Sequence, residues 1–379
     1  MPRRPAWIEV DLDAIAHNYR LVRGRIGPDR RVLAVVKANA YGHGAVPVAR
    51  RLVTEGADML GVATAEEGHE LREAGIIAPV LVMGAAGAAQ IPGMLAAGLT
   101  ATAYSAASLD AILGAGDAGH PVPFHLKLDT GMGRLGLVAG ELPEALARLS
   151  GRRGRASMTG IFTTLSSSDD PDDPFTASQL RLFASALQAV RDAGFSPGFV
   201  HVANSGGIID HPPSWLDTVR PGIMLYGVHP SGRSSRMDLR PALTVKSRLV
   251  LVKEVPAGTP IGYGRAFVTR RPGRIGTIPI GYADGIPRLF AEEGHALVRG
   301  RAAPYAGRIS MDHCMLDVTD LPQAAEGDEV VLLGRQCAAE ITADLAAGWA
   351  RTISYEILAR LGSRLSRLPR SGAEPENSL

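Results

Sequence analysis

A lysine stands at the end of a strongly apolar run in the first tenth of the chain. Residues 31–45 read RVLAVVKANAYGHGA, so the run at 32–36 ends in Lys37 and a Gly-rich segment follows. A continuous apolar run is typical of a strand buried on both faces, and the segment after it is typical of a turn. Lys37 therefore lies where a fold keeps either its core or its chemistry. From this stretch alone, the alternative is that Lys37 has no chemical role and only extends its ammonium into solvent from a strand end.

Three further segments carry groups that could hold a small anion. Residues 125–134 (HLKLDTGMGR) combine basic side chains with glycines, residues 203–207 (ANSGG) offer backbone N–H groups and a hydroxyl, and residues 220–223 (RPGI) add an arginine. Such groups favour a phosphorylated small molecule. Pyridoxal phosphate meets both requirements, because its aldehyde forms a Schiff base with a lysine and its phosphate needs a cradle of donors.

The elements that would position these groups alternate regularly along the chain. Short apolar runs are separated by helix-length amphipathic segments, of which residues 175–194 are the clearest. The candidate strands are residues 32–37, 59–63, 79–83, 100–104, 123–129, 157–163, 199–204 and 218–226. Eight such units predict an α/β fold built on a parallel (β/α)8 TIM-type barrel, with an open doubly wound sheet as the alternative. Lys37 and the three segments then lie at the C-terminal ends of strands, where barrel enzymes keep their sites.

The sequence pattern changes near residue 235. Beyond it, β-rich segments are separated by Pro/Gly turns, and only one further helix is expected, at residues 341–350. We therefore expect a barrel domain at 1–235, a second, mostly β C-terminal domain at 236–366, and a disordered tail at 367–379.

Composition narrows the classes of function. The chain has 379 residues, 46% of them hydrophobic, and a formal net charge of +2, which gives no electrostatic case for nucleic acid or an acidic membrane surface. No signal-peptide pattern follows the basic N-terminal residues, so a cytoplasmic location is expected. The two cysteines, Cys314 and Cys337, have no CxxC spacing, so neither a disulfide framework nor a metal site is expected.

Seven sequence blocks resemble those of the alanine racemases, from about residue 7 to about residue 365. The blocks are AVVKANAYGHG, KLDTGMGRLG, HVANSGG, RPGIMLYG, GYGRAF, IPIGYADG and GRISMDHCMLDV. The resemblance implies a barrel enzyme with a β domain that uses pyridoxal phosphate to interconvert L- and D-alanine, which supplies D-alanine for peptidoglycan. It also implies a head-to-tail homodimer in which the β domain of one subunit completes the barrel site of the other.

The resemblance also assigns roles to individual residues. Lys37 would hold the cofactor and act as one base, and Tyr263 would be the second base, contributed by the partner subunit. Arg220 would face the pyridine nitrogen, and because a guanidinium only donates, it would not protonate that ring, which favours racemisation over transamination. His201 would support Arg220, although a core histidine is the alternative. The residues matching the family's phosphate contacts are Tyr41, Ser205, Gly222, Ile223 and Tyr355.

Further matches concern the substrate. Arg134 and the backbone N–H of Met311 would bind its carboxylate, and Tyr282 and Asp312 would line the channel by which it enters. Lys127 matches a lysine that the family often carries as a carbamate, with an unmodified lysine as the alternative.

One position departs from the family pattern, because Thr164 stands where the family usually has a histidine that stacks on the cofactor ring. Threonine has no π face, which puts cofactor retention and turnover in doubt. Three other functions remain open from the sequence. They are a racemase of another small amino acid such as serine, a decarboxylase of the same architecture, which Arg220 disfavours, and a single-barrel cofactor carrier, which the second domain disfavours.

Overall fold

A computed structural model describes residues 4–152 and 154–372. Its contacts divide the chain into two compact units, each with its own core. Residues 15–40 and 45–240 form the barrel unit. The β unit contains, among the described residues, 4–14, 41–44 and 241–372.

The barrel unit is a closed parallel barrel, which confirms the predicted fold class. Its strands follow one another in chain order and the last pairs with the first. They are β2 (Arg31–Val35), β3 (Met59–Val62), β4 (Val80–Val82), β5 (Leu99–Ala103), β6 (Val122–Lys127), β7 (Ala156–Phe162), β8 (Phe199–His201) and β9 (Thr218–Val219). Each lies within two residues of a predicted start. The last two strands end earlier than predicted, since helical turns follow them.

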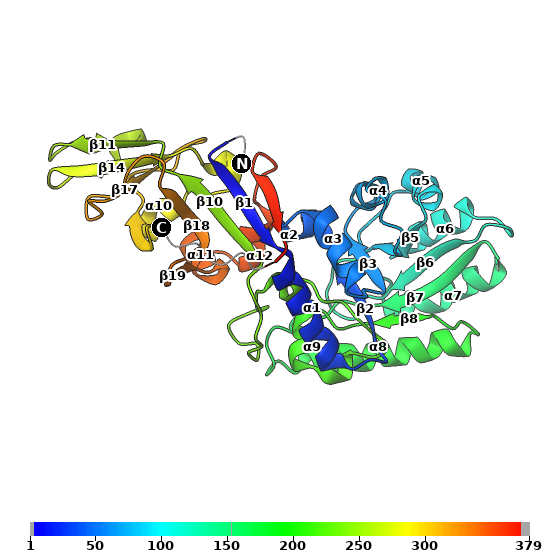
Figure 1. Ribbon diagram of the computed structural model, residues 1–379. Coiled ribbons are helices and arrows are strands. Elements are labelled where there is room, and N and C mark those ends of the chain that lie inside the picture. The colour runs from blue at the N-terminus through cyan, green and yellow to red at the C-terminus, as the bar shows by residue number, and fades with distance from the viewer. Residues whose placement is uncertain (1–3, 153, 373–379) are drawn as a thin grey trace. The chain divides into compact units, whose positions relative to one another are not determined.

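Helices surround these strands on the outside of the barrel (Figure 1). They are most of α1 (Leu12–Ile26), α3 (Ala45–Thr54), α4 (Ala65–Glu73), α5 (Ile91–Ala96), α6 (Ala106–Ala115), α7 (Leu142–Gly151), α8 (Phe175–Asp192) and α9 (Ser205–Asp210). The longest, α8, is the helix predicted at 175–194, and it buries Phe183, Leu187 and Val190 on one face. Covering helices explain why the strands are apolar on both faces.

The β unit is built on a seven-stranded sheet. Its order is β16 (Arg301–Pro304), β15 (His295–Val298), β18 (Glu329–Gln336), β10 (Leu243–Arg248), β1 (Ala6–Asp11) and β20 (Ser366–Arg370), and β19 (Ala339–Ile341) also pairs with β18. The smaller sheets are β11 (Leu251–Val255), β14 (Gly273–Ile278) and β17 (Cys314–Asp317), and the pair β12 (Pro260–Ile261) and β13 (Phe267–Val268). The helices are α10 (Phe290–Glu293), α11 (Ala343–Ala350) and α12 (Ser354–Ala359).

Four segments lie outside the domains expected for them. Residues 41–44 lie in the β unit, residues 236–240 lie in the barrel unit, and two strands differ as well. The N-terminal strand β1, expected in the barrel domain, pairs with β10 and β20 in the β unit. Residues 367–370, expected in a disordered tail, form most of β20, which runs parallel to β1. The two strands differ from the prediction for one reason, since each pairs with strands far away in the sequence and each is too short to signal those partners. Residues 373–379 of the expected tail lie outside the described residues.

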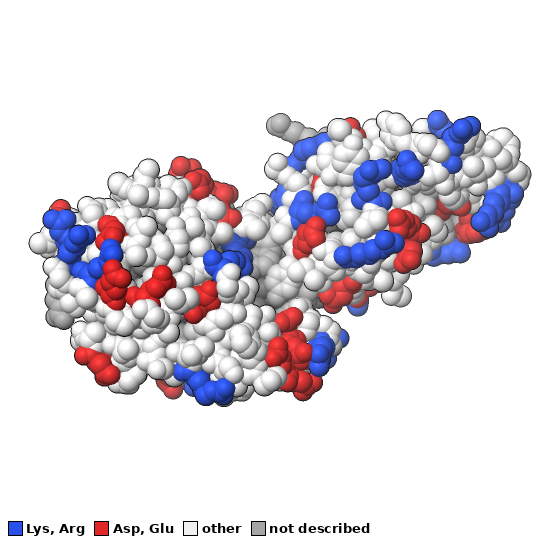
Figure 2. Space-filling model, turned by 180° about the vertical axis from the view of Figure 1, so that it is seen from behind, with Lys and Arg blue, Asp and Glu red and all other residues white. Residues whose placement is uncertain are grey.

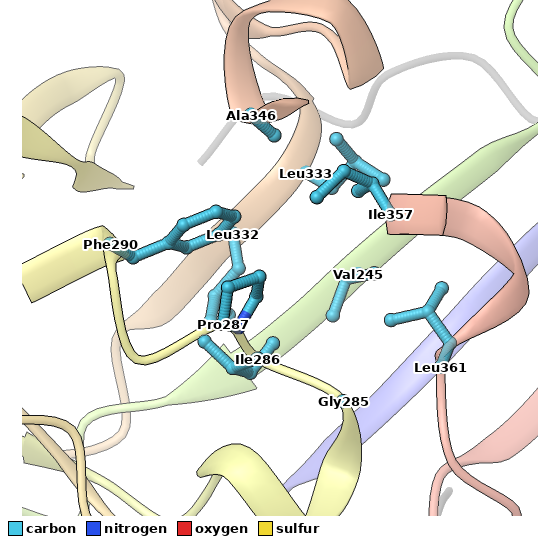
Figure 3. A pocket seen from close by; sticks show the side chains of 10 residues that line it. All are labelled: Val245, Gly285, Ile286, Pro287, Phe290, Leu332, Leu333, Ala346, Ile357 and Leu361. Atoms are coloured by element: carbon cyan, nitrogen blue, oxygen red, sulfur yellow. The ribbon is translucent and has the colours of Figure 1, made fainter. Parts of the chain in front are cut away.

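The β unit has an apolar core between its large sheet and the helices α11 and α12. Side chains of Val245, Leu332, Phe290, Ile357 and Leu361 surround a small void of about 10 Å³ (Figure 3). This is about the least space that one water molecule occupies, and the apolar lining offers that molecule no partner. The core is therefore close-packed, and α11 and α12 are fixed on the sheet.

Charge is distributed without a dominant sign. On the face that Figure 2 shows, basic and acidic side chains are interspersed over each unit, with no broad field of one sign. In the described ranges, none of the helices is long and apolar enough to cross a membrane.

Candidate active site

Lys37 opens a turn of unusual backbone conformation directly after β2. Residues 38–41 all have φ near +52°, which is the left-handed helical region. A non-glycine residue costs about 1–2 kcal/mol there, so the surrounding structure must hold the turn in place. Glu67, at the start of α4, accepts the N–H of Ala38 at 2.6 Å through one carboxylate oxygen and the N–H of Ala63 at 2.7 Å through the other. The position of Lys37 is thus fixed by its own strand and by Glu67.

The amine of Lys37 is half-buried and uncommitted. Within residues 4–152 and 154–372 it makes no hydrogen bond or ion pair. Burial lowers the pKa of Lys37, and the positive charge of Arg134 lowers it further. Glu67 acts in the opposite direction, and Arg220 adds a smaller lowering effect. A lysine with a lowered pKa and no partner is suited to bond to an aldehyde and to carry a proton.

The end of β6 carries a second lysine, Lys127, and a loop that presents Arg134. Burial and the nearby charges of Arg134 and Arg220 lower the pKa of Lys127 to about 8. The loop is held by Asp129, whose carboxylate accepts four backbone N–H groups at 2.9–3.2 Å. Burial acts to raise the pKa of Asp129, but these hydrogen bonds outweigh it and leave the pKa lowered. Arg134 is exposed at the end of this fixed loop, where its guanidinium can meet a carboxylate.

Arg220, just after β9, is buried and bonded through both terminal nitrogens. One donates to Nδ1 and the carbonyl oxygen of His201, at 2.9 and 2.7 Å. The other donates to the carbonyl oxygens of Thr163 and Val202, at 2.7 and 3.1 Å. A guanidinium has five N–H groups, so only Nε–H is left without an acceptor in the described part of the chain. Burial lowers the pKa of Arg220 to about 9, which keeps it charged at neutral pH.

Ser205, Gly222 and Ile223 lie together at one end of the barrel. Ser205 is the first residue of α9, and its hydroxyl oxygen accepts the N–H groups of Gly222 and Met224 at 3.0 and 3.4 Å. The hydroxyl hydrogen of Ser205 has no acceptor among the residues described. A buried hydroxyl that accepts twice and donates to nothing is suited to donate to an anion.

The β unit brings two other predicted residues together. The rings of Tyr41 and Tyr355, the latter on α12, lie 6.2 Å apart between centroids. Gly42 makes this approach possible, because a Cβ at that position would lie 2.2 Å from the carbonyl oxygen of Leu358. Arg367 holds the segment by donating to the carbonyl oxygens of Gly42 and of residues 361, 362 and 365.

The remaining predicted residues lie elsewhere in the β unit and face solvent. Tyr263 is 72% exposed and is flanked by Gly262 and Gly264, which both have positive φ. Met311 is 52% exposed, and its carbonyl oxygen accepts the N–H of Ala283, next to the half-exposed Tyr282. Large apolar side chains in water at a loop tip are typical of a surface that a partner covers.

Asp312 follows Met311 and accepts a hydrogen bond from Arg364 at 2.7 Å. Arg364 also pairs with the fully buried Asp284, at 3.3 Å. The loop that presents Met311 and Asp312 is thus tied to the interior of the β unit.

Sequence reasoning missed Glu67, Asp129 as a loop anchor, and Arg367. Glu67 could have been found as the third helical residue after Thr64, since the two form a capping box at the start of α4. Asp129 stands in the DTGMGR segment, where an aspartate before two glycines is typical of a turn anchor. No sequence pattern indicates the role of Arg367, because every residue type has a backbone carbonyl that could accept its hydrogen bonds.

The fold is that of a two-domain barrel enzyme, and its barrel unit carries a lysine amine at a strand end and the unpaired hydroxyl of Ser205 in the described residues. Family comparisons agree over both units. Residues 10–230 match the model described as "Alanine racemase, N-terminal domain", and residues 242–369 match "Alanine racemase, C-terminal domain". The chain belongs to the alanine racemase family, and its activity is the interconversion of L- and D-alanine.

Individual relatives match along nearly their whole length. "Alanine racemase 2" of Caldanaerobacter subterraneus subsp. tengcongensis is 42% identical over 96% of this chain and 95% of its own. The alanine racemase of Symbiobacterium thermophilum is 44% identical over 96% and 97%. Among solved structures, alanine racemase from a D-cycloserine-producing Streptomyces lavendulae is 37% identical with a TM-score of 0.92, covering 99% of both chains. The Bacillus anthracis enzyme with bound L-Ala-P is 33% identical with a TM-score of 0.93, covering 98% of this chain and 96% of that one.

Proposed function

We propose that this chain racemises alanine with pyridoxal phosphate held on Lys37. The observation that carries the proposal is the uncommitted amine of Lys37, with its lowered pKa, in the same unit as the uncommitted hydroxyl of Ser205. An amine for an aldehyde and a hydroxyl for a phosphate are the two contacts that this cofactor needs. When bound, the cofactor supplies an electron-withdrawing ring that makes the α-proton of an amino acid easier to remove.

The phosphate is proposed to lie at the hydroxyl of Ser205 and the backbone N–H of Ile223, next to Gly222, whose own N–H supports Ser205. Tyr41 and Tyr355 remain further phosphate donors predicted from the sequence. Neutral donors suit this role, because they neutralise no charge and leave the phosphate dianion in place. Arg220 is proposed to offer Nε–H to the pyridine nitrogen. A guanidinium that stays charged at neutral pH donates a hydrogen bond but does not transfer its proton to a pyridine nitrogen. That nitrogen therefore stays unprotonated, which disfavours transamination and decarboxylation.

Arg134 is proposed to bind the substrate carboxylate, helped by the backbone N–H of Met311. Lys37 then moves a proton on one face of Cα. The other face needs a second group, and Tyr263 is proposed to supply it from the partner subunit. Support comes from its exposure, since a catalytic tyrosine left in water by its own subunit needs another surface to activate it. The assembly is proposed to be a head-to-tail homodimer, with Tyr282 and Asp312 lining the channel into the site.

Lys127 is proposed to be a carbamate in the working enzyme. As an ammonium it would repel Arg134 in a site that already holds Lys37 and Arg220. As a carbamate it would be an anion and attract Arg134 instead.

Covalent trapping tests the central assignment. Borohydride reduction of the purified protein with its cofactor, followed by peptide mapping, is expected to place the label on Lys37. Label on Lys127 or Lys253 would contradict the proposal. A chiral product assay with L-alanine, L-serine and L-lysine then measures substrate breadth. A cytoplasmic location remains a prediction, which fractionation of the producing cells would test.

A further inference from the structure

A line of three hydrogen-bonded side chains crosses the interior of the barrel. It begins at Arg220, which donates to Nδ1 of His201 at 2.9 Å. It continues from Nε2 of His201 to Nδ1 of His125, on β6, at 2.8 Å. Both histidines have no exposed surface, and Arg220 is 5% exposed. His125 has no place in the function proposed above.

The donor and acceptor roles along this line determine which ring nitrogen of each histidine carries the hydrogen. Arg220 can only donate, so Nδ1 of His201 must accept and the hydrogen of His201 must lie on Nε2. That N–H points to Nδ1 of His125, which must accept in turn. The hydrogen of His125 therefore lies on its Nε2. One permanent donor thus sets the tautomers of two successive imidazoles.

Both imidazoles are held neutral, as this arrangement requires. Burial lowers the pKa of His125 to about 3, and the charge of Arg220 adds to the effect. Burial and the same charge also lower the pKa of His201 far below its usual value. Protonation of His201 would set an N–H against the guanidinium, which is a direct repulsion.

A histidine at position 125 leaves one buried nitrogen unpaired among the described residues and requires a glycine beside it. Nε2 of His125 is buried without a partner in the described part of the chain, and an unpaired buried donor destabilises the folded state. On β7, Gly160 leaves the room, because a Cβ there would lie 2.6 Å from Nε2 of His125. The ring also stacks on Phe199, with centroids 5.6 Å apart. A phenylalanine would keep this stacking without the unpaired donor, so packing alone does not account for a histidine.

We propose that His125 is a positioning residue for Arg220. Its Nδ1 accepts from His201, which presents an acceptor to Arg220, and Arg220 is left with Nε–H as its one donor for the cofactor ring. The inference rests on the proposed function, since it assigns that donor to the cofactor. Without His125, the N–H of His201 loses its acceptor, and the tautomer that suits Arg220 loses its support.

Two substitutions separate hydrogen bonding from packing. His125→Asn keeps an acceptor close to the place of Nδ1 but loses most of the ring. His125→Phe keeps the ring but has no acceptor. We expect His125→Phe to bind pyridoxal phosphate about tenfold more weakly than the wild type, and His125→Asn to stay within about threefold. If instead His125→Phe binds as the wild type does and His125→Asn binds weakly, the role of His125 is packing and the proposal is wrong.

A second measurement needs neither a folded His125 variant nor bound cofactor. In ¹⁵N-histidine-labelled wild-type protein stripped of cofactor, NMR should show His201 and His125 as neutral imidazoles with hydrogen on Nε2, and His201→Asn assigns the signals. The Nε2–H of His201 should exchange slowly with water. A hydrogen on Nδ1 of His201, or a charged imidazole at neutral pH, would overturn the proposal. Failure of the wild type to bind the cofactor at all would instead count against the proposed function, and the NMR result would distinguish the two.

Discussion

At the scale of single residues, two lysines in one unit have different environments and different expected chemistry. Each has one carboxylate that favours its charged form, Glu67 for Lys37 and Asp129 for Lys127. Each also lies near Arg134 and Arg220, but the pKa falls further for Lys127, to about 8. The neutral amine is the form that reacts with carbon dioxide. With a pKa of about 8, Lys127 is increasingly neutral as the pH rises through 8, while an ordinary lysine stays charged until about 10.

Carbamate formation at Lys127 is therefore expected to rise between pH 7 and 9. Protein equilibrated with ¹³C-bicarbonate should show a carbamate carbon signal by NMR, and Lys127→Ala should lose it. The exposed Lys253 provides the control, since Lys253→Ala should leave the signal unchanged. A signal that survives Lys127→Ala would place the modification elsewhere.

Tyr263→Phe tests the two-base mechanism, because it keeps the ring and removes only the ionisable group. Loss of one acid–base group is expected to slow racemisation about 10²- to 10⁴-fold in both directions, since each direction needs both groups. Lys37 should still exchange the α-proton of one enantiomer. Exchange into D₂O followed by NMR should therefore strongly favour one enantiomer. Equal exchange into both would mean that another residue is the second base.

Thr164→His tests the one departure from the family pattern. Thr164 follows β7, and its carbonyl oxygen accepts from Gln179 at 3.1 Å, so the backbone is anchored independently of the side chain. A histidine ring there could stack on the cofactor, and stacking contributes about 0.5–1.5 kcal/mol. We expect pyridoxal phosphate to bind roughly twofold to tenfold more tightly in Thr164→His, measured by equilibrium titration. Unchanged binding would show that position 164 does not touch the ring.

The residue types predicted candidate site residues but not the groups that hold them in place. Lys37 and Ser205 stand at the end of a predicted strand or directly after it. Arg220 falls inside the predicted strand 218–226, and only the structure puts it just after a strand end. Glu67 accepts a hydrogen bond from the backbone N–H that follows Lys37, and His125 bonds to another side chain. These partners are far away in the sequence, so no motif predicts the contacts. Among the described residues, the acceptors of Arg220 leave only its Nε–H unpaired. Three of these acceptors are carbonyl oxygens that only the folded chain brings together.

At the scale of elements, the segment after Lys37 depends on Gly42. This glycine has φ of +83°, and any Cβ would collide with the carbonyl oxygen of Leu358 on α12. Gly42→Ala is expected to lower the free energy of unfolding by roughly 2–4 kcal/mol, because strain and collision add. Gly75 is a matched control, with φ of +79° and no atom within 4 Å of the place a Cβ would take, so Gly75→Ala should cost only about 1 kcal/mol. If urea unfolding shows equal losses of unfolding free energy in the two variants, the contact between Gly42 and α12 contributes nothing to stability.

Periodicity predicted the elements that repeat and missed those that do not. The eight barrel strands and α8 recur in a regular pattern, and all were found. The six-residue helix α12 is too short for a helical period, and β1 and β20 have no repeating neighbour, so none of them was predicted.

At the scale of the whole molecule, the proposed shared site would make activity a property of the pair of subunits. Lys37→Ala and Tyr263→Ala should each be inactive alone. If subunits exchange freely in an equal mixture, half of the dimers are mixed and one of their two sites is intact, so about a quarter of the wild-type activity should return. Lys37→Ala mixed with Arg134→Ala should regain nothing, since both changes lie in the barrel unit. No recovery after verified exchange would rule out sharing.

The pairing of β1 with β20 also sets an order on events during synthesis. About 350 residues separate the two strands, so at roughly 5–20 residues per second the ribosome needs tens of seconds to deliver the second after the first. During that interval the segments of the barrel unit emerge and can close. Both edges of β1 stay unpaired until β10 emerges, and the edge that β20 covers stays unpaired until the end. The apolar residues of β1 are then exposed to any protein that binds nascent chains, and the large sheet of the β unit is completed only when translation is nearly over.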